Sequence, residues 1–198
     1  MPSEAHAEPA TTVRSQLAID TSSAKIYRSP DQGDMEGSCV LADEIPVAHT
    51  PDGGWHGEMP RPILAACTEP LAHDAPDLRA TWTAYAVERD GKPVVDHPLN
   101  RHIERIEQCG NRVVITAGHV IHDMRVDGTL ANGVNDVLEI SLTQKIQVAA
   151  VFNNGRLDLH PGGVDPARPP LVTREIVDGE LIWNYAVFKV TMRKVGDS

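Results

Sequence analysis

The sequence predicts an all-β protein, with an antiparallel up-and-down β-barrel of eight to ten strands as its main part. From residue 77 onward, short runs rich in β-branched and aromatic residues alternate with turn signals about every 8–12 residues. No segment there shows a 3.6-residue hydrophobic period over the length of a helix. A meander of this size leaves two exposed edges unless it closes, which favours a barrel over the alternative of a two-sheet sandwich.

Composition divides the 198-residue chain into three parts. Residues 1–23 are predicted to be a disordered tail, because they are rich in Ala, Ser, Thr and Glu and contain no aromatic residue. Residues 24–76 are predicted to form an irregular arm, since their many prolines disfavour helices and central strands. Residues 77–198 are predicted to form the barrel. We expect the arm to pack across the barrel or to cover its mouth.

Nine segments are predicted as strands, in order along the barrel. Hairpin turns are expected at ArgAspGlyLys (89–92), at AsnAsnGly (153–155) and at AspGlyGlu (178–180), because these sequences suit tight turns. A Gly/Pro-rich loop is expected over residues 161–170. The predicted strands are residues 78–88, 101–108, 112–117, 119–126, 137–142, 146–152, 156–160, 171–177 and 181–195.

Composition also restricts the partners. The formal net charge of −10 argues against nucleic acid and against an anionic membrane surface. No apolar run approaches the roughly 20 residues of a membrane span, and the first residues lack the order of a signal peptide. Three cysteines show no metal-ligand spacing, and a chain of this length needs neither a disulfide nor a metal to fold. We therefore expect a reduced, cytoplasmic protein without metal or cofactor, and leave homodimer formation open.

One predicted strand, residues 101–108, carries polar side chains on both of its faces. His102 and Glu104 lie on one face, and Arg105 and Glu107 lie on the other. A solid apolar core would not tolerate such charges without partners. Two interpretations remain: a wet or ligand-filled barrel interior, for which a barrel of this size has room, or a rim strand with both faces in solvent.

Three segments resemble the calycin superfamily, which comprises the lipocalins and the fatty-acid-binding proteins. AspLeuArgAlaThrTrp (77–82) sits where these proteins carry a tryptophan on the first barrel strand. Residues 103–115 look like the strand–turn–strand of fatty-acid-binding proteins, and residues 173–183 are similar to their penultimate hairpin. The resemblance covers residues 77–195. It implies a closed barrel with an internal pocket for a small hydrophobic molecule, and some barrels of this shape are enzymes.

Five residues are candidates for contacting such a ligand. The alternating apolar neighbours of His122 place its imidazole inward, as a group for a polar ligand head or as an ordinary core histidine. Arg105 could hold a ligand carboxylate if its face is the inner one, and Arg174 is a second candidate for an inward cation. Tyr85 could donate its hydroxyl, and Trp183 could line or close the barrel.

These features support three hypotheses about function. The first is binding of a small, largely hydrophobic molecule in the barrel interior. The second is a cofactor-independent enzyme in the same cavity, of the isomerase, cyclase, hydratase or lyase type, with His122 as acid/base and Glu104 as the second catalytic residue. The third is an interaction protein whose acidic arm docks a partner or a second copy of the chain.

Overall fold

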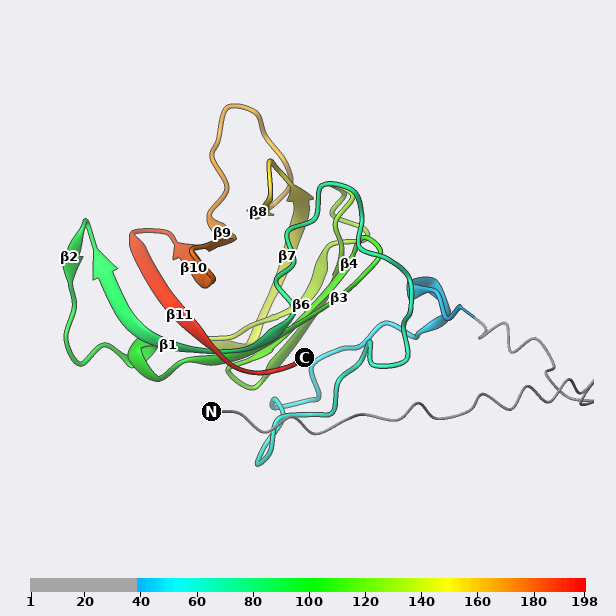
Figure 1. The fold of residues 1–198 in the computed structure, drawn as a ribbon, viewed down its shortest axis with the longest axis horizontal. Coiled ribbons are helices and arrows are strands. Elements are labelled where there is room, and N and C mark those ends of the chain that lie inside the picture. Colours follow the sequence, from blue (N-terminus) through cyan, green and yellow to red (C-terminus); the bar gives the residue numbers. More distant parts are fainter. Residues whose placement is uncertain (1–38) are drawn as a thin grey trace, which may run out of the picture. The chain divides into compact units, whose positions relative to one another are not determined.

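The computed structural model describes residues 39–198, and within them it contains two short 3-10 helices and eleven strands. Ten strands form one antiparallel sheet in the order β5-β4-β3-β1-β11-β10-β9-β8-β7-β6, and β2 pairs with β1 (Figure 1). The predicted tail and residues 24–38 of the predicted arm lie outside the described residues. The elements are η1 (Ala42–Glu44), β1 (Ala80–Arg89), β2 (Lys92–Pro93), η2 (Pro98–Arg101), β3 (Ile103–Cys109), β4 (Arg112–Ala117), β5 (Val120–Arg125), β6 (Val134–Leu138), β7 (Ser141–Phe152), β8 (Arg156–Pro161), β9 (Val172–Val177), β10 (Glu180–Tyr185) and β11 (Phe188–Gly196).

The sheet curls into a nearly closed barrel. β1 pairs with β3 on one side and with β11 on the other, so the first and last strands of the chain meet. In the described part of the chain no backbone ladder joins β5 to β6, and we call this gap the seam. Two hydrogen bonds cross it: His122 Nε2 donates to the Val137 carbonyl at 2.9 Å, and the Arg125 N–H donates to the Asn132 carbonyl at 2.7 Å. The predicted antiparallel all-β barrel is confirmed by this strand order, and the sandwich alternative is wrong.

The three predicted hairpin turns lie where the sequence indicated. Asp90, Asn154 and Asp178 have φ values of 52°, 52° and 53°, and a glycine with positive φ follows each of them. This pair of left-handed residues is the geometry that matches the twist of two antiparallel strands. The hairpins β1–β2, β7–β8 and β9–β10 follow from it.

Two predicted strands are wrong, because each contains a turn. Residues 137–142 hold the turn between β6 and β7, and residues 181–195 hold the turn between β10 and β11. The second turn passes through Ala186 at φ 52°, a conformation usually taken by Gly, Asn or Asp. Apolar residues alternate through the first turn, and an unbroken apolar run over residues 185–188 crosses the second, so neither turn has a Gly, Pro, Asn or Asp residue to signal it.

A second hydrophobic core lies outside the barrel, in addition to the core inside it. It is formed between residues 39–76, the described part of the predicted arm, and the outer faces of β3, β4 and β5. Figure 1 shows the blue to cyan part of the arm running beside β3 and β4. The buried members of this outer core are Ala42, Leu64, Cys109, Val114 and Ile121.

The arm explains the polar residues on both faces of β3. Arg105 Nη2 donates to the Pro60 carbonyl at 2.6 Å, and Glu107 accepts the N–H of Leu64 at 2.7 Å. Both side chains are buried under the arm and bonded to its backbone. The interpretation of this segment as a rim strand in solvent is therefore wrong, because the arm covers its outer face.

The arm is also attached by a disulfide between Cys67 and Cys109, whose Cα atoms are 6.2 Å apart. The expectation of a fully reduced protein is wrong for this pair, because the arm brings residue 67 to the end of β3. Glu69 lies beside the two sulfurs, but sulfurs bonded to each other are not available as thiolate ligands. Cys39 is free and exposed.

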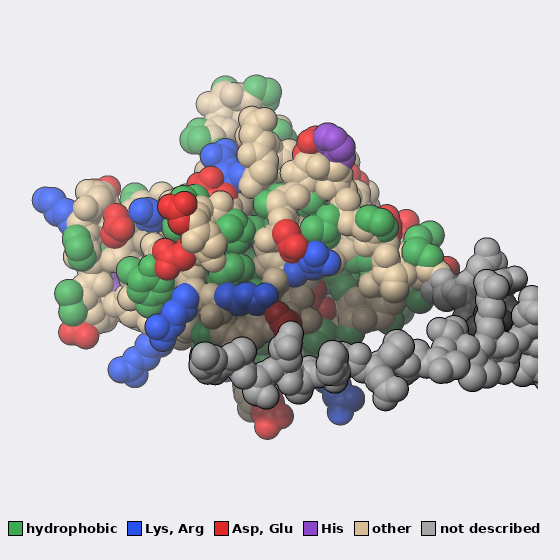
Figure 2. All heavy atoms as spheres, viewed as in Figure 1, with side chains coloured by type: hydrophobic (Ala, Val, Ile, Leu, Met, Phe, Trp, Pro, Cys, Tyr) green, Lys and Arg blue, Asp and Glu red, His purple; other side chains and the backbone are tan. Residues whose placement is uncertain are grey.

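The described surface mixes charge and apolar groups. On the face drawn in Figure 2, Lys/Arg and Asp/Glu side chains are interspersed among hydrophobic ones. None of the helices in the described residues combines the length and the apolar character needed to cross a membrane.

Candidate functional site

The barrel encloses a cavity of about 320 Å³ on the inner faces of its strands. Ten of its 17 lining residues are Leu, Ile or Val, including Ile115, Ile146 and Val148. Leu99, the β6–β7 turn and the β8–β9 loop contribute to the lining at one end of the barrel. A mainly aliphatic cavity with a few polar groups is typical of small-molecule sites.

An ion pair between β3 and β9 lies against this cavity. Arg174 lines the cavity, and its Nε and Nη2 donate to Glu104 Oε1 and Oε2 at 3.0 and 2.8 Å. The two side chains are only 7% and 0% exposed. The guanidinium carbon of Arg174 also lies 5.1 Å from the ring centroid of Trp183. Two parallel N–H···O bonds fix the position of both charges.

His102 extends this cluster toward the end of the barrel. Its Nε2 lies 3.6 Å from Glu104 Oε2, and its Nδ1 lies 3.4 Å from Glu139 Oε1. Its ring packs against Trp183 at 4.8 Å between centroids, with the two planes tilted by 39°. Burial acts to lower the pKa of His102, but the Glu104 and Glu139 carboxylates outweigh it and raise this pKa above its ordinary value. His102 therefore favours its protonated form between two acidic groups.

Burial, charged neighbours and hydrogen bonds also shift the pKa values of Glu104 and His122. Burial acts to raise the pKa of Glu104, but the charges of Arg174 and His102 and the hydrogen bonds from Arg174 lower it to about 2. Burial lowers the pKa of His122, and its bond to the Val137 carbonyl offsets this only in part. At neutral pH, Glu104 is thus ionised and His122 is neutral.

Four of the sequence candidates lie at or beside the cavity. Arg174, His122 and Trp183 line it, and Glu104 points inward to Arg174. His122 is inward as its apolar neighbours indicated, but its Nε2 spans the seam to Val137. The structure thus brings together Glu104 and Arg174, which are 70 residues apart in the sequence.

The other two candidates are placed elsewhere, and these predictions are corrected. Arg105 lies on the outer face of β3 under the arm, since alternation puts it opposite Glu104. Tyr85 is on the surface, where its hydroxyl donates to Glu180 at 2.6 Å. Tyr185 is the tyrosine that lines the cavity.

Three polar residues of the site were not among the sequence candidates: His102, Glu139 and Gln144. The alternation of residues 101–108 put His102 on the same face as Glu104, so that signal was present. Glu139 lies in the β6–β7 turn, within residues 137–142 that were predicted to be a strand. No sequence signal placed it beside His102.

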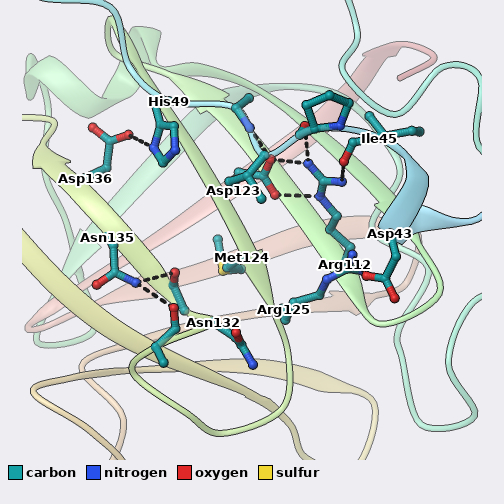
Figure 3. Close-up of a pocket in the computed structure, with 15 residues that line it drawn as sticks. Asp43, Ile45, His49, Arg112, Asp123, Met124, Arg125, Asn132, Asn135 and Asp136 are labelled. Atoms are coloured by element: carbon teal, nitrogen blue, oxygen red, sulfur yellow. Dashed lines mark hydrogen bonds and ion pairs between the residues drawn. The ribbon is translucent and has the colours of Figure 1, made fainter.

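A second, larger pocket of about 540 Å³ lies between the arm and the seam (Figure 3). Its charged groups are paired with each other. Arg112 donates to Asp123 at 2.8 and 2.6 Å, and Asp123 also accepts the N–H of Ala48 from the arm. Asp136 on β6 accepts the N–H of Thr50 at 2.9 Å. These groups hold the arm across the seam, so we take the interior cavity as the candidate site.

Known proteins show only a distant similarity to this chain. No protein-family model matches the chain, and no curated protein matches it. Among solved structures, the chain is similar to human cRBP IV at 17% sequence identity, covering 60% of this chain and 98% of the other, with a TM-score of 0.39. The assignment of the fold rests on the strand pairing of this chain.

Proposed function

We propose that the protein binds a small, largely apolar molecule in the interior cavity. The observation that carries this proposal is the cavity itself: about 320 Å³, with Leu, Ile or Val at ten of its 17 lining positions. A volume of this size is at the lower end of the range for small-molecule sites. Burying an apolar ligand there would release water from aliphatic surface, which is the main favourable term in such binding.

The enzyme alternative has less support, because its proposed groups are already engaged. His122 donates to the Val137 carbonyl across the seam, and burial lowers its pKa. Glu104 is bonded twice to Arg174, and its pKa of about 2 makes it a poor acceptor of a proton at neutral pH. We therefore assign His122 to holding the seam together and Glu104 to pairing Arg174.

The disulfide between Cys67 and Cys109 indicates in which compartment the protein is located. Disulfides persist in oxidising compartments and are rare in the cytosol. The Cys67–Cys109 disulfide therefore favours an oxidising compartment over the cytoplasm that the cysteine count suggested.

Binding of the neutral fluorophore N-phenyl-1-naphthylamine tests the proposed function. We expect its fluorescence to rise on mixing with the protein, and the midpoint of thermal unfolding to increase with probe concentration. Ile146→Trp should abolish the fluorescence, because Ile146 lines the cavity and the larger side chain would fill it. The stability cost of such overpacking is about 1–3 kcal/mol.

Lys145→Trp is the matched control, because Lys145 is exposed on the opposite face of β7. It should keep the binding of the wild type. If Ile146→Trp is folded and binds the probe as the wild type does, the ligand is not in this cavity and the proposal is wrong.

A further inference from the structure

We propose that the interior cavity selects uncharged ligands, namely small apolar molecules whose polar group is a hydroxyl or carbonyl rather than an ion. This inference rests on the proposed function, because it names the ligand class for the same cavity. It follows from the way in which the charges beside the cavity are already paired.

Arg174 is the cation that lines the cavity, and its charge is already neutralised. Both of its bonds to Glu104 are short, at 3.0 and 2.8 Å, and the Glu104 side chain is 0% exposed. A ligand carboxylate could bind Arg174 only by displacing Glu104. That would leave the Glu104 carboxylate buried without a counter-ion, a change that is strongly unfavourable in protein interiors.

The remaining charges offer no substitute for Arg174. His102 lies between Glu104 and Glu139, so its positive charge, when present, faces two carboxylates. Glu104, Glu139, Arg174 and His102 together have no net charge when His102 is protonated. They carry a single negative charge when His102 is neutral. His122 is neutral, because burial lowers its pKa. An anion therefore meets no surplus of positive charge in either state.

A cationic ligand is disfavoured for a related reason. It would lie beside the buried guanidinium of Arg174. The Glu139 carboxylate, which lines the cavity, already faces His102 Nδ1 at 3.4 Å, and Glu104 behind it holds two hydrogen bonds from Arg174. A neutral polar group needs no counter-ion, and one donor beside the cavity is free to bond it. The indole Nε1 of Trp183, whose ring lines the cavity, is buried without a hydrogen-bond partner among the described residues. A ligand hydroxyl or carbonyl oxygen could accept its hydrogen.

Competition between three ligands of equal chain length tests this inference. Decan-1-ol, decanoate and decylammonium would each be titrated against bound N-phenyl-1-naphthylamine at neutral pH. We expect decan-1-ol to displace the probe, and each ion to bind at least about tenfold more weakly. If the probe itself does not bind, the proposed function fails. If the probe binds but decanoate or decylammonium competes as well as decan-1-ol, the selectivity for neutral ligands is wrong while the proposed function stands.

Glu104→Gln tests the cause of the selectivity. Removing the carboxylate leaves the charge of Arg174 free, so decanoate should bind at least about tenfold more tightly than it binds the wild type, while decan-1-ol changes little. Glu175→Gln is the matched control, since Glu175 neighbours Arg174 on β9 but lies on its outer face. No gain of decanoate affinity in folded Glu104→Gln would overturn the inference. If that variant does not fold, the wild-type competition alone decides it.

Discussion

The residues that define the cavity combine structural and binding roles. Glu104 and Arg174 are both buried, and a buried ion pair is costly to assemble unless its geometry satisfies both partners. The bidentate bonds between them meet that condition. The pair joins β3 to β9 across the barrel interior, and it places one wall of the cavity at a defined position.

Stability should depend on pH through His102. Its pKa is raised in the folded protein above the ordinary value of 6.5, so its contribution to the free energy of unfolding is complete below pH 6.5 and is lost as the pH rises through the raised pKa. We therefore expect the stability difference between wild type and His102→Gln to shrink as the pH is raised above 6.5, measured by urea unfolding with circular dichroism.

His122→Gln serves as the control with the opposite sign. Its folded pKa is lowered below 6.5, so its contribution is complete above pH 6.5 and is lost as the pH falls through the lowered pKa. Glu104 and Glu139 face His102 on either side, and Arg174 is the nearest cation. A stability difference for His102→Gln that grows above pH 6.5 would contradict the assignment of this cluster.

At the scale of elements, the sequence predicted the barrel and the turns that contain an Asp-Gly or Asn-Gly pair. It did not predict the β6–β7 and β10–β11 turns, which contain no such pair. Turns such as residues 178–179 carry an Asp-Gly pair, whose positive φ values have a recognisable chemical signature. The Ala186 turn has none, because an alanine at φ 52° is held there by the flanking strand pairs and not by its own preference. Glu139 was missed for the same reason, since it occupies the β6–β7 turn.

The inward face of β3 could not be predicted either, because both of its faces are buried: the inner one inside the barrel and the outer one under the arm. The alternation of side chains reveals which face of a strand is inward only when the outer face is solvated or when one face is apolar. Arg105 and Glu107 on the outer face are neither solvated nor apolar. Their partners are backbone groups of an irregular segment more than 40 residues away in the sequence. No local pattern encodes such contacts.

The disulfide between the arm and β3 should contribute directly to stability. It closes a loop of 42 residues, and removing a cross-link of this kind costs about 2–4 kcal/mol. We expect Cys67→Ala/Cys109→Ala to lose this amount in urea unfolding, and the wild type with a reducing agent to approach the same value. Cys39→Ala should change stability little, because Cys39 is exposed and unbonded. Equal stability of the wild type with and without the reducing agent would show that the arm does not depend on the bond.

At the scale of the whole molecule, the barrel and the described part of the arm form one compact unit, Ser38–Ser198. The arm supplies the outer core and closes the seam from outside, where Ala48 and Thr50 bond to carboxylates of β5 and β6. We therefore expect the barrel to depend on the arm for its stability.

Truncation tests this dependence. Deleting residues 1–75 removes three backbone carbonyls that accept hydrogen bonds from Arg112, a side chain only 1% exposed, and uncovers the apolar side chains of Val114 and Ile121. Each buried polar group left without a partner costs about 1–3 kcal/mol, and whole domains are stable by only about 5–15 kcal/mol. We expect this truncated chain to be unfolded or aggregated by circular dichroism and size-exclusion chromatography.

Deleting residues 1–37 is the matched control, because it leaves the compact unit that begins at Ser38 complete. This shorter deletion should retain the sheet spectrum and the binding of N-phenyl-1-naphthylamine. The comparison also bears on the arm as a docking element: a loss of oligomers in the longer deletion would reflect unfolding of the barrel and not removal of an interface. A folded, probe-binding chain after deletion of residues 1–75 would show that the arm is an accessory to the barrel, contrary to the packing described above.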